Sequence, residues 1–171
     1  MNKDKIYRIA LVAVALIALV AGVWWFQGRQ ERSSQAERDQ QRYNSLVRTN
    51  DTLASNRKYD QAAKGLQDYL ATKPPKKFER GAMVLLATTY VNAQKYDEAL
   101  TWYQKVEKQD GKDKADVAVG MAYAYDAKGD KENAIKYFQK AIALAEKSDD
   151  PMANADKKSY EYEIKRLRGE Q

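Results

Sequence analysis

The motif Lys58-Tyr59-Asp60-Gln61-Ala62 occurs a second time as Lys95-Tyr96-Asp97-Glu98-Ala99, and a shorter third copy reads Lys131-Glu132-Asn133-Ala134. The alanines of the three copies are separated by 37 and then 35 residues. Self-similarity at such a period is typical of repeat proteins, in which each repeat is one supersecondary unit that cannot bury its apolar face alone. The chain is therefore expected to contain three stacked units.

The residues around the alanines show helical periodicity on both sides. Apolar residues upstream of the second and third alanines recur at steps that place them on one face of a helix, and further apolar residues follow downstream. The upstream positions are Met83, Leu86, Ala87 and Tyr90, then Ala118, Met121, Ala122 and Tyr125, and the downstream ones are Tyr103 and Val106, then Phe138 and Ala141. Each unit is predicted to be a pair of amphipathic helices, with Gly129-Asp130 as the turn of the third unit, so the fold is predicted to be all-α.

This pattern resembles the tetratricopeptide repeat over residues 43–148. In that family a small residue and then an aromatic residue lie in the first helix (helix A), and the second helix (helix B) has an alanine followed by a bulky residue one turn later. The matching residues are Ala87 and Ala122, Tyr90 and Tyr125, the three motif alanines, and Leu66, Tyr103 and Phe138, with Pro74 at the closing proline. The resemblance implies three helix pairs in a short α-solenoid.

The chain departs from the family pattern at several positions. Asn50 takes the place of the small residue in the first unit, and Met83 and Ala118 stand where tryptophan is common. Gly111 and Glu146 replace the closing proline in the later units. A generic array of helical hairpins therefore stays open as an alternative.

Residues 149–171 are predicted to form a capping helix and the C-terminus. In the stretch from Ala153 to Arg168, Tyr160, Ile164 and Leu167 fall on one helical face, and the other face is charged. Stacked repeats leave an apolar end that must be covered, and a half-polar helix serves this purpose.

The N-terminal region contains an apolar stretch, residues 9–28, without any charged residue. As a helix it extends about 30 Å, the thickness of the hydrocarbon core of a bilayer. The short basic tail 1–8 precedes it, and Trp24, Trp25 and Phe26 lie near its other end, as in an aromatic belt. This stretch is predicted to be a transmembrane signal anchor that binds the lipid bilayer and makes the protein single-pass.

Two alternatives to an anchor remain. A signal peptide cleaved near Val20-Ala21-Gly22 gives a secreted binding module, and a buried core helix needs a larger protein around it. Residues 29–42 are polar and predict a helical stalk, with a disordered linker as the alternative. The C-terminal domain is expected outside the cytoplasm, periplasmic or at the cell surface in a bacterium, because a short basic tail is hard to translocate.

The resemblance implies that exposed residues of helix A line a concave groove that binds a protein partner. Valines at one repeated position argue against a clamp for a chaperone carboxylate. The implied groove residues are Asn44, Val47, Arg48 and Asp51 in the first unit, Val84, Thr88, Val91 and Asn92 in the second, and Val119, Tyr123 and Asp126 in the third.

Composition excludes several classes of function. The chain has no cysteine and no histidine, so catalytic triads and the commonest metal ligands are lacking, and we expect no enzyme activity and no cofactor. The net charge of +6 is spread among many carboxylates without a compact basic block, so nucleic acid is not an expected partner. Asn50-Asp51-Thr52 is a glycosylation sequon, which has meaning only in a eukaryotic secretory pathway.

The layout resembles small bitopic bacterial proteins with tetratricopeptide repeats. It predicts an adaptor or scaffold that binds proteins at a membrane or serves a multi-subunit envelope complex. The alternatives are a permanent structural subunit of a larger membrane assembly and the secreted module described above.

Overall fold

The computed structural model describes the backbone of residues 3–110, 114–147 and 151–170, and the side chains of residues 18–109, 114–147 and 156–170. All regular secondary structure in these ranges is α-helical, which confirms the all-α prediction. The chain divides into two compact units, Met1–Tyr43 and Asn44–Gln171, and each is described by itself.

The first unit consists of most of α1, a continuous helix from Lys3 to Ser55. Residues 29–42, for which a disordered linker was the alternative, are helical. Among the residues whose side chains are described, no helix combines the length and apolarity needed to cross a membrane. The predicted span at 9–28 lies partly outside that range, because residues 9–17 are described only as helical backbone. The membrane span therefore stays a prediction.

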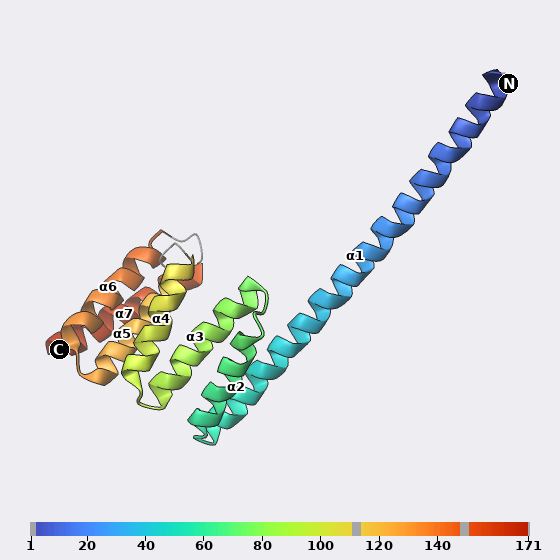
Figure 1. Ribbon diagram of the computed structural model, residues 1–171. Coiled ribbons are helices and arrows are strands. Elements are labelled where there is room, and N and C mark those ends of the chain that lie inside the picture. The colour runs from blue at the N-terminus through green and yellow to red at the C-terminus, as the bar shows by residue number, and fades with distance from the viewer. Residues whose placement is uncertain (1–2, 111–113, 148–150, 171) are drawn as a thin grey trace. The chain divides into compact units, whose positions relative to one another are not determined.

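The second unit contains the end of α1 and six further helices, which follow one another in space in chain order, with α7 against α6 (Figure 1). The helices form three consecutive pairs, which are the end of α1 with α2, α3 with α4, and α5 with α6. The helices are α2 (Tyr59–Ala71), α3 (Lys76–Asn92), α4 (Tyr96–Asp110), α5 (Ala115–Lys128), α6 (Lys131–Ala145) and α7 (Pro151–Arg168).

The motif alanines are all buried inside the array. Ala62 is 2% exposed, and Ala99 and Ala134 are completely buried. Ala87 and Ala122 on the first helices of the second and third pairs are also completely buried. Small side chains at these positions allow the helix axes to approach, so the repeat in the sequence is a repeat of close helix contacts.

Each pair has the same turn between its helices. Arg57, Gln94 and Gly129 lie five residues before the three alanines and all adopt the left-handed conformation, with φ of 56°, 60° and 88°. Their N–H groups donate to the carbonyls three residues back, and the next N–H groups donate to carbonyls five residues back. This is the Schellman arrangement, which satisfies the last carbonyls of a helix. Only the third turn uses glycine, the residue that adopts this conformation without steric cost.

The departure at Asn50 is accommodated by a polar contact. Asn50 is 4% exposed, and its Oδ1 lies 3.2 Å from the Thr89 hydroxyl of α3, which is also buried. Thr89 Oγ1 lies 2.8 Å from the Leu85 carbonyl as well, so its single proton is shared between two acceptors. The sequon asparagine is therefore buried in the folded unit.

The last helix covers the end of the array. Ile164 and Leu167 of α7 are buried in one cluster with Ala122, Ala134 and Phe138 of the third pair. The helix begins at Pro151, a residue that suits a first helical turn because its missing N–H has no intrahelical partner there. The apolar face read from the sequence is thus the face that α7 buries.

Candidate protein-binding site

All eleven predicted groove residues lie on the first helices of the pairs, that is, the end of α1, α3 and α5, and none of them is buried. We call this set of residues the helix-A face. The half-buried members are Val47, Val84, Val91, Val119 and Asp126, and the exposed ones are Asn44, Arg48, Asp51, Thr88, Asn92 and Tyr123. Their role in binding is not tested by this geometry and stays a prediction.

One position of the helix-A face carries the same residue in every pair. Val47, Val84 and Val119 each lie 15 residues before a motif alanine, and all three are half-buried. Val84 also packs against the core cluster formed by α3, α4 and α5. The face therefore has a stripe of branched apolar side chains that are partly exposed to solvent.

A polar contact between the two helices of the second pair was missed from the sequence. Tyr103 of α4 is 3% exposed, and its hydroxyl lies 3.0 Å from Thr88 Oγ1 of α3. Since the Thr88 hydroxyl donates to the Val84 carbonyl, Tyr103 is the donor to Thr88. Burial raises the pKa of the Tyr103 phenol, so the group stays neutral and able to donate. This contact fixes the exposed Thr88 side chain.

Gly120 of α5 makes room for Tyr103. A Cβ on Gly120 would lie 2.4 Å from Cζ of the Tyr103 ring, a distance that atoms cannot adopt. A glycine inside a helix usually weakens it, so its presence in α5 was the available signal for a close approach. The tyrosine that makes the approach belongs to the preceding pair and is not marked in the sequence.

Two ion pairs connect α5 to the helices α3 and α7. Nη2 of Arg80 on α3 lies 2.9 Å from both carboxylate oxygens of Asp116 on α5. Arg166 on α7 pairs with Asp126 on α5 and with Glu163 on its own helix. These contacts raise the pKa of Arg166, with the Glu163 hydrogen bond as the larger cause. Asp126, predicted as a groove residue, is therefore already paired with the capping helix.

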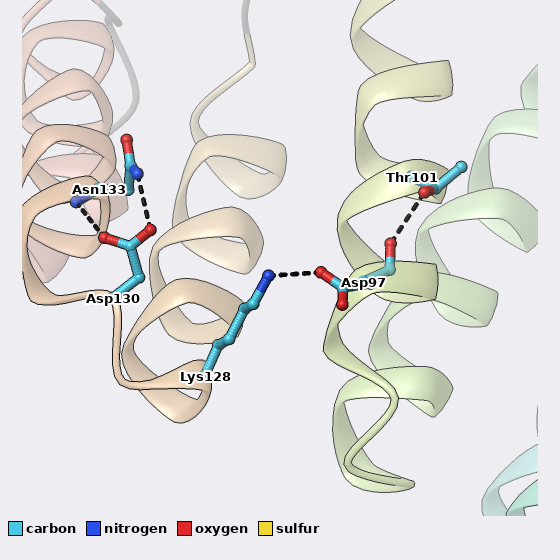
Figure 2. Close-up of polar contacts among 5 residues, drawn as sticks. All are labelled: Asp97, Thr101, Lys128, Asp130 and Asn133. Atoms are coloured by element: carbon cyan, nitrogen blue, oxygen red, sulfur yellow. Dashed lines mark hydrogen bonds and ion pairs between the residues drawn. The ribbon is translucent and has the colours of Figure 1, made fainter.

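The motif aspartates connect consecutive pairs at their turns. Lys95 Nζ lies 2.7 Å from Asp60 Oδ1, and Lys128 Nζ lies 2.5 Å from Asp97 Oδ1, as Figure 2 shows for the latter. Hydrogen bonds from these lysines to the aspartates raise the pKa of both lysines. The aspartates are well exposed, so each ion pair is expected to contribute little to stability.

The chemistry of the helix-A face suits binding. Within the part of the chain that the structure describes, no group of three or more side chains of the metal-binding types comes together. The face combines valines, hydroxyls and amides with charged side chains, of which Asp126 is paired with Arg166. A surface of this composition can make apolar contacts and hydrogen bonds with a protein segment.

The comparison with protein families agrees with this geometry. Residues 79–147 match the model of a tetratricopeptide repeat family, and this range contains most of α3 and all of α4, α5 and α6. The repeat array is thus a tetratricopeptide-repeat fold, and residues 79–147 are tetratricopeptide repeats. The resemblance read from the motif residues is confirmed, and this fold is typical of proteins that bind other proteins.

Solved structures with the same fold include a bacterial chaperone. PcrH in complex with the chaperone binding region of PopD, and PcrH from Pseudomonas aeruginosa, both have a TM-score of 0.60 and 18% identity, covering 74% of this chain and 90% and 91% of theirs. A TPR-like protein from Chlorobium tepidum has a TM-score of 0.53 and 17% identity, covering 74% of this chain and 94% of its own. None of the curated protein sequences compared with this chain matches it. At such identities the likeness concerns the fold alone.

Proposed function

We propose that this protein is a membrane-anchored adaptor whose helix-A face binds a segment of a partner protein at a membrane or envelope complex. The observation that carries the proposal is that all eleven face residues, including the repeated valines, reach solvent, while the apolar residues between the helices are buried. The structural neighbour PcrH binds a region of PopD, which supports a binding role for the fold.

The anchor part of the proposal rests on the first unit. Leu19, Val20, Trp24, Trp25 and Phe26 are more than half exposed along α1, so their apolar surface is not covered within this helix. Arg29 stacks on the Trp25 ring at 4.1 Å from its centroid, an arrangement suited to the boundary between lipid and water. Together with the uncharged sequence before it, this segment supports insertion into a bilayer.

The binding part is tested with a pair of matched threonines. Thr88 on α3 and Thr101 on α4 are both exposed, and each hydroxyl donates to the carbonyl four residues back. Only Thr88 lies on the helix-A face. A photoreactive residue at Thr88 should capture a defined protein in intact membranes, and one at Thr101 should not. Equal capture at both sites, or none at Thr88, contradicts the proposal.

The anchor part is tested by extraction and by labelling. The unaltered protein should stay in the membrane during alkaline extraction. Leu19→Arg should release it, because a charge near the centre of the span is costly. The chain has no cysteine, so a single one introduced at Thr101 reports orientation through an impermeant maleimide. Labelling from the outer side is expected. If the unaltered protein is fully soluble, the membrane anchor is wrong. If labelling occurs only after lysis, the proposed orientation is wrong.

The alternative, a permanent structural subunit, differs from the adaptor in how fast the bound partner protein is exchanged. A permanent subunit copurifies at fixed stoichiometry in high salt, whereas an adaptor exchanges its partner within the time of a pull-down. A chase with unlabelled protein distinguishes the two, since only an adaptor loses its captured partner.

A further inference from the structure

The helix-A face ends in a distinct aromatic surface between α5 and α7. The Tyr123 side chain is 40% exposed, and its ring stands edge-on to Phe138 with 5.1 Å between the centroids. Tyr160 of α7 stacks on the same Phe138 ring at 6.1 Å. Two phenol rings thus share one buried support, which holds both of them in fixed positions at the surface.

Carboxylates surround these rings. Burial raises the pKa of Tyr123, the carboxylates of Glu163, Asp126 and Asp156 raise it further, and the Arg166 guanidinium lowers it. The Tyr160 hydroxyl interacts with the Asp156 carboxylate as well. The local balance is therefore an excess of negative charge, on a protein whose net charge is positive. We call these six residues, the two tyrosines and the four charged ones, the Tyr123 surface.

An arginine of the chain itself, Arg166, already forms ion pairs within this surface. Arg166 is held by the carboxylates of Asp126 on α5 and Glu163 on α7 at the same time. The folded structure thus already holds one guanidinium between two carboxylates of this surface. Asp156 is exposed, and its carboxylate adds a further negative charge next to the rings.

We infer that the Tyr123 surface binds a lysine or arginine side chain of the partner segment. A cation placed over a tyrosine face is attracted by the ring, and the excess of carboxylates adds charge complementarity. The inference rests on the proposed function, because it names the chemistry of the partner that the helix-A face takes at its C-terminal end. An acidic partner segment would meet repulsion at this position.

Three peptides test the inference without knowledge of the natural partner. The probes are acetylated pentapeptide amides with four alanines and a central arginine, norleucine or glutamate, added to the full-length isotope-labelled protein in detergent micelles. The arginine peptide should shift the amide resonances of Tyr123 and Glu163 in a saturable way. Raising the salt concentration from about 50 mM to about 500 mM should weaken the affinity for this peptide several-fold. Equal shifts with norleucine or glutamate, or no saturable shift, overturn the inference.

Matched variants localise the effect. Tyr123→Leu and Asp156→Asn should each lower the affinity for the arginine peptide by about threefold or more, since one removes the ring and the other a negative charge. Tyr162→Leu is the control, because Tyr162 is 66% exposed on α7 and is not part of the surface. A loss with Tyr162→Leu as large as with Tyr123→Leu contradicts the assignment. If the peptides fail while a probe at Thr88 still captures a protein, this inference falls and the proposed function stands.

Discussion

The second and third helix pairs bury an alanine at the equivalent position, Ala99 and Ala134, but surround it with different residues. Five residues before the alanine the second pair has Gln94 and the third has Gly129. Four residues after it the second pair has Tyr103 and the third has Phe138, and both side chains are almost completely buried. The comparison teaches that the repeat is specified by close helix packing and turn geometry, and that stability should differ between the pairs where the surrounding residues differ.

The largest effect is expected at the bulky residue that follows the alanine. Phe138 is completely buried and contacts Tyr123, Tyr160 and the α7 cluster. Phe138→Ala should lower the free energy of unfolding by about 3–5 kcal/mol, because it removes apolar contact and leaves a cavity between the third pair and the cap. Urea unfolding followed by circular dichroism measures the loss, and Phe138→Leu should lose much less. A loss below about 1 kcal/mol would mean that α7 does not depend on this ring.

A second test uses glycine to alanine substitutions at two helical positions. Gly120→Ala should destabilise the protein by about 1–3 kcal/mol, because the new methyl group collides with the Tyr103 ring that connects the second pair to the third. Gly65→Ala in α2 is the matched control, since a Cβ at that position would meet nothing within 4 Å. The control should stabilise by about 0.5–1 kcal/mol through helix propensity, and urea unfolding measures both variants.

The sign of the difference is what matters in this pair of variants. Combining Gly120→Ala with Tyr103→Leu should recover part of the loss, because the shorter side chain no longer reaches the added methyl group. If both glycine substitutions stabilise the protein, the close approach of Tyr103 to α5 is wrong.

The turns give a smaller and reciprocal effect. Gln94 and Gly129 occupy the same left-handed position, and only glycine does so without a steric penalty. Gln94→Gly should therefore change stability in the favourable direction, and Gly129→Gln should cost about 1 kcal/mol. Thermal melting of the two variants measures this exchange. Destabilisation by Gln94→Gly would show that the Gln94 side chain contributes more than its backbone strain costs.

The sequence predicted what repeats and could not predict what occurs once. The alanines and the helix pairs follow from local periodicity, because side chains spaced by three and four residues share a helical face. The exposure of the helix-A residues was implied by the family resemblance. The Asn50–Thr89 contact joins residues 39 positions apart, and nothing in either segment marks the other as its partner. The same holds for Gly120 with Tyr103 and for Asp126 with Arg166. The left-handed turns in the first two pairs were missed because the usual glycine signal is present only in the third.

The smallest expected effect distinguishes the starts of α4 and α6, where the pairs have Lys95 and Asp130. The Asp130 carboxylate accepts hydrogen bonds from the side chain and the backbone N–H of Asn133 and so caps α6, as Figure 2 shows. These bonds lower the pKa of Asp130 below its ordinary value of 3.8. Stabilisation by the cap is therefore fully present above the unfolded pKa and is lost as the pH falls through the folded pKa.

Asp130→Ala should accordingly lower the melting temperature at neutral pH, and the difference from the unaltered protein should vanish in acid, below the lowered pKa. Lys95→Ala is the control at the same position of the second pair. Because the Asp60 carboxylate raises the Lys95 pKa, that side chain stays charged throughout neutral and acidic conditions. Added salt should screen the contact between Lys95 and Asp60, whereas the cap of α6 should resist salt because its hydrogen bonds are local. If the difference in melting temperature between Asp130→Ala and the unaltered protein depends on salt, then the charge of Asp130, and not its capping hydrogen bonds, stabilises the start of α6.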